Sequence, residues 1–250
     1  MEHFSFGKGE KTMVILPGAS VKSVMLAADA VAAAYDCFAE DYTVYVFDCH
    51  DNLKAGCTIE GIARETASAM RELGIENADI FGCSLGGMIA QYLAIESPEL
   101  VHKMVLGSTL SRHNEFSRAT CEVWRRLADS GDAAALNRDI FSRVYSKAYY
   151  EKYKDVFASM EPLGEPEELE RFSAIINACA NMDSYDELDR ISCPVLVMGS
   201  WDDNTLSPQG NVEIAEKLGC GLFMYSGYGH AVYDEAPDYR ERIMKFFAEQ

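Results

Sequence analysis

The sequence predicts an α/β fold in which a doubly wound, mostly parallel sheet carries a helical cap insertion. Short apolar segments rich in β-branched and aromatic residues alternate with helical segments over residues 1–110 and again over 191–250. That alternation is typical of parallel strands joined by crossover helices. Residues 111–190 instead show helical periodicity and little strand character. We therefore expect a core formed by 1–110 and 191–250, and a cap formed by 111–190.

The predicted core elements alternate in order along the chain. Strands are expected at 12–16, 42–47, 78–81, 101–106, 194–198 and 221–225, with room for about one more strand before residue 12. Helices are expected at 24–38, 58–73, 87–96, 208–218 and 239–247. Thr58 and Gly74 are residue types that begin and end helices, and they flank the second of these. Ligands of such sheets bind at the carboxyl ends of the strands.

The predicted cap contains helical patterns at 120–129, 133–145, 149–160 and 167–181. Its aromatic residues could wall an apolar pocket or pack the cap against itself and the core, and packing is the commoner role for any one of them. These residues are Trp124, Phe141, Tyr145, Tyr149, Tyr153, Phe157 and Phe172.

Composition excludes several classes of function. A formal net charge of −18 disfavours binding to nucleic acid or to anionic membranes. The sequence has no apolar run long enough to span a membrane, and its first residues lack the regions of a signal peptide. The eight cysteines are scattered with no Cys-x-x-Cys pair, which argues against a zinc site or a disulfide framework. We expect a cytoplasmic protein with reduced thiols, no cofactor and no metal.

The segment Gly82-Cys-Ser84-Leu-Gly86 is the most informative motif in the chain. An apolar strand pattern precedes it and a helical pattern follows it, which is the context of a nucleophile elbow. Ser84 would occupy a strained turn that brings its neighbours close together, so that only glycine fits at positions 82 and 86. Ser84 is the candidate nucleophile.

A serine nucleophile needs a base and an acid that orients the base, and after this elbow the expected order is Ser, Asp or Glu, then His. Asp202 and Asp203 follow the strand predicted at 194–198, and His230 follows the strand predicted at 221–225. We favour Asp202 over Asp203 as the acid, and His230 as the base. His50 is the strongest rival histidine, because it also follows a strand end.

Acyl chemistry also requires hydrogen-bond donors for the developing oxyanion. The backbone N–H of Leu85 would be one, at the positive end of the helix that follows Ser84. A second is expected from the turn Pro17-Gly18-Ala19, where Gly18 permits close approach and the N–H of Ala19 is the natural donor.

With these motifs in order, the chain resembles the α/β-hydrolase fold superfamily of the capped type over nearly its whole length. The resemblance implies Ser84 as nucleophile, Asp202 as acid, His230 as base, and Ala19 and Leu85 as oxyanion donors. The sequence departs from the family at Pro17, where many relatives have histidine, and in 48–53, which lacks the usual Arg-Gly and Gly-Ser residues of that loop.

We expect a cofactor-independent serine hydrolase that cleaves an ester or thioester of a small, apolar substrate. Because a fold does not fix a reaction, other chemistries of this superfamily remain alternatives, namely aminopeptidase, C–C hydrolase and lyase. A ligand-binding protein with little turnover is a further alternative. An aminopeptidase would want a carboxylate in the cap, for which Glu161, Glu165, Glu167 and Glu168 are available. The sequence predicts neither the substrate nor the oligomeric state.

Overall fold

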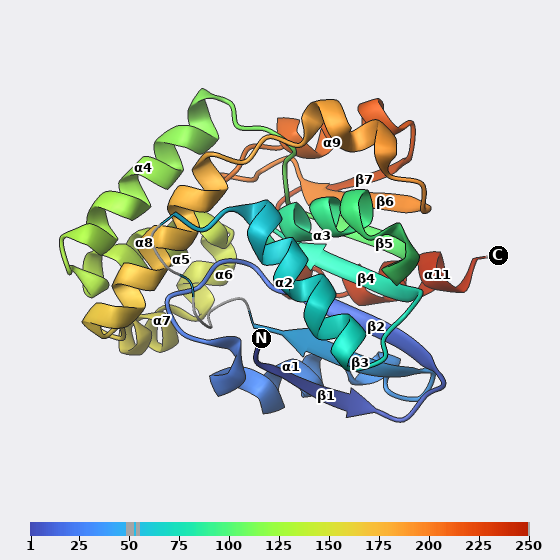
Figure 1. Ribbon diagram of the computed structural model, residues 1–250. Helices are drawn as coiled ribbons and strands as arrows, with labels where there is room; N and C mark the ends of the chain where they lie inside the picture. The colour runs from blue at the N-terminus through green and yellow to red at the C-terminus, as the bar shows by residue number, and fades with distance from the viewer. Residues whose placement is uncertain (49–52, 54–55, 250) are drawn as a thin grey trace.

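A computed structural model of the chain describes residues 1–48, 53 and 56–249. Its centre is a seven-stranded sheet in the order β1-β3-β2-β4-β5-β6-β7 (Figure 1). Only β1 runs antiparallel to its neighbour, and the other described pairings are parallel. The strands are β1 (His3–Gly7), β2 (Lys11–Leu16), β3 (Tyr42–Phe47), β4 (Ala78–Cys83), β5 (Val101–Gly107), β6 (Val195–Ser200) and β7 (Gly221–Tyr225). The predicted fold class is confirmed, including a single strand before residue 11.

Helices cover both faces of the sheet because successive strand residues point to opposite sides. In β4, Ile80 belongs to the apolar cluster on the face that α2 (Ile59–Glu72), α3 (Leu85–Glu96) and α9 (Gln209–Leu218) cover. The next residue, Phe81, packs on the other face with α11 (Tyr239–Ala248), α10 (Val232–Glu235) and the segment around α1 (Ala28–Ala34). β4 is therefore buried on both sides, which holds the residue that follows it in a fixed position.

The second predicted helix has the ends that its sequence indicates. The Thr58 hydroxyl accepts a hydrogen bond from the N–H of Gly61 at 3.0 Å and caps α2. Leu73 is the C-cap of the helix, and Gly74 follows with a φ of +71°. Gly74 thus takes the left-handed position just beyond the last turn, one residue after the observed C-cap, where glycine is favoured.

Between β5 and β6 the chain forms helices that lie at the carboxyl ends of the strands (Figure 1). They are α4 (Glu115–Asp129), α5 (Ala133–Val144), α6 (Lys147–Lys152), α7 (Lys154–Met160) and α8 (Pro166–Ala180). The pattern predicted as one helix at 149–160 is two helices, which break at Tyr153. A bridge between Arg112 and Asp183 joins the two ends of this segment. Within the described part of the chain, no helix is long and apolar enough to cross a membrane.

Candidate active site

Ser84 lies in the turn between β4 and α3, in a backbone conformation that non-glycine residues rarely adopt (φ 52°, ψ −118°). The flanking glycines are steric requirements of this turn. A Cβ on Gly82 would lie 2.4 Å from the carbonyl oxygen of Gly86, and a Cβ on Gly86 would lie 1.8 Å from that of Leu16. The backbone strain at Ser84 is therefore held in place by close packing on both sides, as expected of a nucleophile elbow.

His230 lies in the loop after β7, with a side chain that is only 2% exposed. It lines the same cavity as Ser84, Gly18 and Ala19, a hollow of about 510 Å³. A Cβ on Gly18 would come within 3.3 Å of the Cβ of Ser84, so the loop after β2 passes directly beside the serine. The structure thus brings together four of the predicted site residues, because Ser84, His230 and Ala19 line one cavity and Leu85 begins α3 immediately after Ser84.

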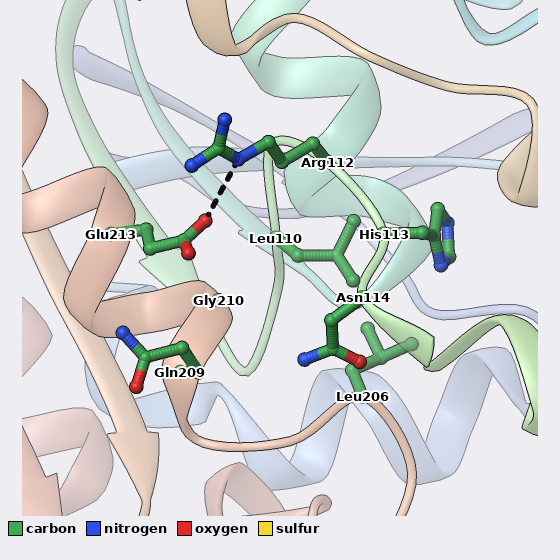
Figure 2. Close-up of a pocket in the computed structure, with 8 residues that line it drawn as sticks. All are labelled: Leu110, Arg112, His113, Asn114, Leu206, Gln209, Gly210 and Glu213. Atoms are coloured by element: carbon green, nitrogen blue, oxygen red, sulfur yellow. Dashed lines mark hydrogen bonds and ion pairs between the residues drawn. The ribbon is translucent and has the colours of Figure 1, made fainter. Parts of the chain in front are cut away.

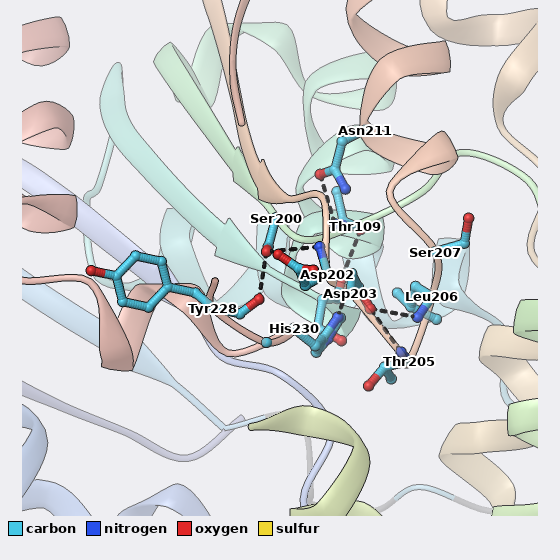
Figure 3. A network of polar contacts seen from close by, with 12 residues as sticks. Thr109, Ser200, Asp202, Asp203, Thr205, Leu206, Ser207, Asn211, Tyr228 and His230 are labelled. Atoms are coloured by element: carbon cyan, nitrogen blue, oxygen red, sulfur yellow. Dashed lines mark hydrogen bonds and ion pairs between the residues drawn. The ribbon is translucent and has the colours of Figure 1, made fainter. Parts of the chain in front are cut away.

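The acid beside His230 is Asp203, and the prediction of Asp202 for this position is wrong. His230 Nδ1 lies 2.8 Å from Asp203 Oδ2, whereas Asp202 Oδ2 accepts a hydrogen bond from the N–H of Gly227 at 2.6 Å (Figure 3). The cause is the turn after β6. The hydroxyl of Ser200 accepts from the N–H of Asp202 at 3.1 Å and donates to Tyr228 O, and this turn directs Asp202 to solvent and Asp203 inward.

The Asp203 carboxylate is fully buried and has several donors around it. Its Oδ1 accepts from the N–H groups of Thr205 at 2.7 Å and Leu206 at 2.9 Å (Figure 3). Burial alone would raise the pKa of this carboxyl, but the adjacent His230 and the two backbone donors hold the pKa below its usual value. Asp203 is therefore ionised at neutral pH and can fix the orientation of the imidazole. The acceptor pattern to the second and third following N–H groups is that of an Asx turn, which the sequence alone does not assign to Asp203 rather than to Asp202.

The other described histidines have partners away from Ser84. His102 Nδ1 lies 2.8 Å from Asp79 Oδ1, and His113 contacts the hydroxyl of Ser117 and a backbone oxygen. His3 lies near a backbone oxygen at the start of the chain. The strongest rival in the sequence, His50, lies outside the described residues.

Three of the predicted aromatic residues line the cavity, namely Trp124, Phe141 and Tyr145. Phe157 stacks on Phe141 and on Tyr145, with ring centroids 4.8 and 4.9 Å away. Phe172 is fully buried beside Trp124. The remaining two, Tyr149 and Tyr153, continue the stack, because Tyr149 contacts the ring of Tyr145 and Tyr153 contacts the ring of Tyr149. Some of these aromatic residues therefore line the cavity, and the others pack against the lining side chains and fix the orientation of those side chains.

The acidic residues suggested for recognition of an amino terminus are mostly occupied. Glu161 pairs with Arg138 at 2.7 Å, and Glu168 pairs with Lys22 at 2.6 Å. The Glu165 side chain takes part in the capping box of α8. These contacts give the carboxylates structural partners and lend no support to an aminopeptidase.

A second, smaller hollow of about 40 Å³ lies between the loop after β5 and α9 (Figure 2). Arg112 and Glu213 both line it, and Arg112 Nε lies 3.1 Å from Glu213 Oε2 (Figure 2). The hollow contains none of the residues around Ser84. Among the residues that the structure describes, no group of three or more His, Cys, Asp or Glu side chains could hold a metal ion.

Comparison with known proteins gives the family of the chain. A sequence model of the alpha/beta hydrolase fold family matches residues 16–237. The chain belongs to this family. It is 27% identical over 230 residues to a candidate carbamate hydrolase, RutD of Stutzerimonas stutzeri. The aligned region covers 84% of this chain and 83% of that protein. The chain is 28% identical over 203 residues to a candidate non-heme bromoperoxidase, BpoC of Mycobacterium tuberculosis, over 77% of this chain and 76% of the relative.

Solved structures share the fold of this member of the family. MGS-M2, an alpha/beta hydrolase enzyme from a deep-sea metagenome library, superposes with a TM-score of 0.86 at 20% identity, over 100% of this chain and 94% of the other. The enol-lactonase of Burkholderia xenovorans superposes with a TM-score of 0.85 at 20% identity, over 99% and 96% of the two chains. At these identities the likeness concerns the fold.

Proposed function

We propose that this protein is a serine hydrolase that cleaves a carboxylic ester or thioester of a small, largely apolar substrate. One observation carries the proposal. A strained serine at a strand-to-helix turn shares a cavity with a buried histidine, and that histidine is hydrogen-bonded to a buried, ionised aspartate. This is the set of groups that activates a hydroxyl for attack on a carbonyl carbon.

In the proposed reaction, Ser84 Oγ forms a bond to the substrate carbonyl carbon while His230 Nε2 takes the hydroxyl proton. Asp203 accepts the Nδ1–H hydrogen bond, holds the required tautomer and stabilises the imidazolium that forms. Collapse of the tetrahedral intermediate expels the alcohol or thiol, which receives the proton from His230. A water molecule then attacks the acyl-enzyme, gives its proton to His230, and releases the acid and free Ser84.

The oxyanion of each tetrahedral intermediate needs donors on the opposite side from His230. We assign this role to the backbone N–H groups of Leu85 and Ala19. Leu85 is the first residue of α3, whose positive end adds to the stabilisation of negative charge. Ala19 belongs to the loop that lines the same cavity as Ser84, and a Cβ on the preceding Gly18 would lie 3.3 Å from the Cβ of Ser84.

We further propose that residues 111–190 act as a cap domain that selects the substrate. The cavity walls combine the loop after β2 with side chains from α4, α5 and the turn after α7, and most of these side chains are apolar. The relatives named as a carbamate hydrolase and an enol-lactonase fit a reaction at a carbonyl group. Cys83 and Cys121 are buried thiols that suit the reducing cytoplasm in which we place the protein.

Turnover of short-chain p-nitrophenyl esters tests the proposal. Ser84→Ala should abolish hydrolysis, because Ser84 is the group that forms the acyl-enzyme in the proposed reaction. Ser226→Ala, an exposed serine in the loop after β7, is the matched control and should retain wild-type rates. Hydrolysis at wild-type rate by the Ser84→Ala protein would overturn the assignment.

A further inference from the structure

The cavity next to Ser84 contains one buried amide whose hydrogen-bonding is incomplete. Asn137 lines the cavity and is 6% exposed. Its Nδ2 donates to the backbone oxygens of Glu161 at 3.0 Å and Leu163 at 2.7 Å, which uses both hydrogens of the amide. Among the described residues, no donor is hydrogen-bonded to its Oδ1, and this oxygen is not one of the fully buried atoms without a partner, so it remains accessible.

The orientation of this amide is fixed by its partners. A carbonyl oxygen can only accept a hydrogen bond, so the atom that faces Glu161 and Leu163 must be the nitrogen. The oxygen is therefore held in place as an acceptor. Lys22, also on the cavity wall, pairs with Glu168 and can only donate, and the Ser23 hydroxyl spends its hydrogen on Asp48. Asn137 Oδ1 is thus a carbonyl acceptor of fixed orientation that is available to a ligand.

The place of Asn137 in the cavity follows from the helix that carries it. Asn137, Ile140, Phe141 and Val144 all line the cavity and have the spacing of one helical face of α5. At one end of this face, the Val144 oxygen accepts from the N–H of Ala231 at 2.8 Å, directly beside His230. Asn137 lies two turns away, about 10 Å along the helix axis. Apolar side chains occupy the face between these two points.

We propose that Asn137 is a specificity residue that accepts a hydrogen bond from the substrate. The preferred ester or thioester then has an apolar arm that ends in a hydrogen-bond donor, such as a hydroxyl group, about 10 Å along α5 from Val144, whose oxygen accepts from the N–H next to His230. A substrate that places a methyl group there leaves the amide oxygen unsatisfied in an apolar cavity, which is unfavourable. This inference rests on the proposed function, because it takes the cavity to be the substrate site.

Matched esters test the inference. The p-nitrophenyl ester of ω-hydroxyoctanoate is compared with the isosteric nonanoate, in which a methyl group replaces the hydroxyl. The hydroxyl-to-methyl ratio of kcat/KM should be about tenfold higher in the wild type than in Asn137→Leu. Ile140→Val, on the same helical face, changes the shape of the wall without removing an acceptor and should leave the ratio unchanged. Equal ratios in wild type and Asn137→Leu would overturn the assignment.

Two further measurements keep the test independent of folding and of turnover. In the wild type alone, an isosteric ω-methoxy ester should be disfavoured against the ω-hydroxy ester, because an ether oxygen cannot donate to Asn137 Oδ1. Calorimetry on Ser84→Ala with the methyl esters of the same acids measures binding without hydrolysis. Tighter binding of the hydroxy ester would support the role of Asn137 even if Ser84 proved not to be a nucleophile. Equal binding of the hydroxy and methyl-terminated esters would refute it.

Discussion

Replacement of Asp203 by asparagine tests the part of the site that the sequence did not predict. The substitution keeps the shape of a fully buried side chain. The asparagine Oδ1 can still accept from the N–H groups of Thr205 and Leu206. The atom that faces His230 Nδ1 then becomes an NH₂ donor, so Nδ1 must accept and the ring proton moves to Nε2. In that tautomer His230 cannot take the proton of Ser84.

The expected magnitude is large because the change affects the proton transfer itself. Loss of the correct tautomer in a serine–histidine–aspartate site lowers kcat by about 10⁴. Asp202→Asn provides the matched control one residue away. Its oxygen can still accept from the N–H of Gly227, and a change at this exposed position alters free energies by about 0.5 kcal/mol or less. Activity of Asp202→Asn should therefore stay within about twofold of the wild type.

The assay is steady-state hydrolysis of a p-nitrophenyl ester by the three proteins, with circular dichroism to verify folding. A folded Asp203→Asn protein with near wild-type kcat would refute the assignment of Asp203. So would an Asp202→Asn protein whose kcat falls by several orders of magnitude.

Stability gives a second test of Asp203. The pKa of Asp203 is lowered in the folded protein, so its charge contributes stability above the unfolded-state pKa, and that contribution is lost as pH falls through the folded-state pKa. The difference in free energy of unfolding between wild type and Asp203→Asn should shrink on acidification below about pH 4.

Three other predictions follow from the packing around the site. Gly86→Ala should yield little folded protein, because its Cβ would lie 1.8 Å from a backbone oxygen of β2; soluble expression and circular dichroism check this. Burial raises the pKa of the Cys83 thiol to about 12, so iodoacetamide at pH 8 should leave Cys83 unmodified in the folded protein by peptide mass spectrometry. Glu235 accepts hydrogen bonds from the N–H groups of Gly229 and Ser146 and from the Ser146 hydroxyl. Ser146→Ala should lower Tm by about 2–4 °C and kcat several-fold, since it loosens the loop that carries His230; an unchanged Tm and kcat would contradict this.

Much of the fold could be predicted because local signals and packing agree. β3 and β7 consist mostly of β-branched, aromatic and other apolar residues. The bounds of both strands match the prediction. The helix predicted at 149–160 is less regular. Tyr153 ends α6 in a non-helical conformation and lets Tyr149 and Tyr153 continue the aromatic stack, an arrangement set by tertiary contacts that periodicity does not contain.

At the site, the sequence predicts which loops meet but not which of two adjacent side chains points inward. Ser84 and His230 follow from motif and order. Asp202 and Asp203 differ only in the direction that the turn gives them, and that turn depends on a hydrogen bond between Ser200 and the distant Tyr228. The role proposed for Asn137 likewise depends on its contacts with Glu161 and Leu163. These contacts cannot be predicted from the local sequence around Asn137.

The central claim is that Ser84 is an activated nucleophile, and covalent labelling tests it most directly. The wild-type protein is incubated with a fluorophosphonate and analysed by intact-protein and peptide mass spectrometry. We predict a single adduct on Ser84 that is absent from Ser84→Ala and forms far more slowly in Asp203→Asn. No adduct on the folded wild-type protein, or an adduct on another residue, would contradict the account.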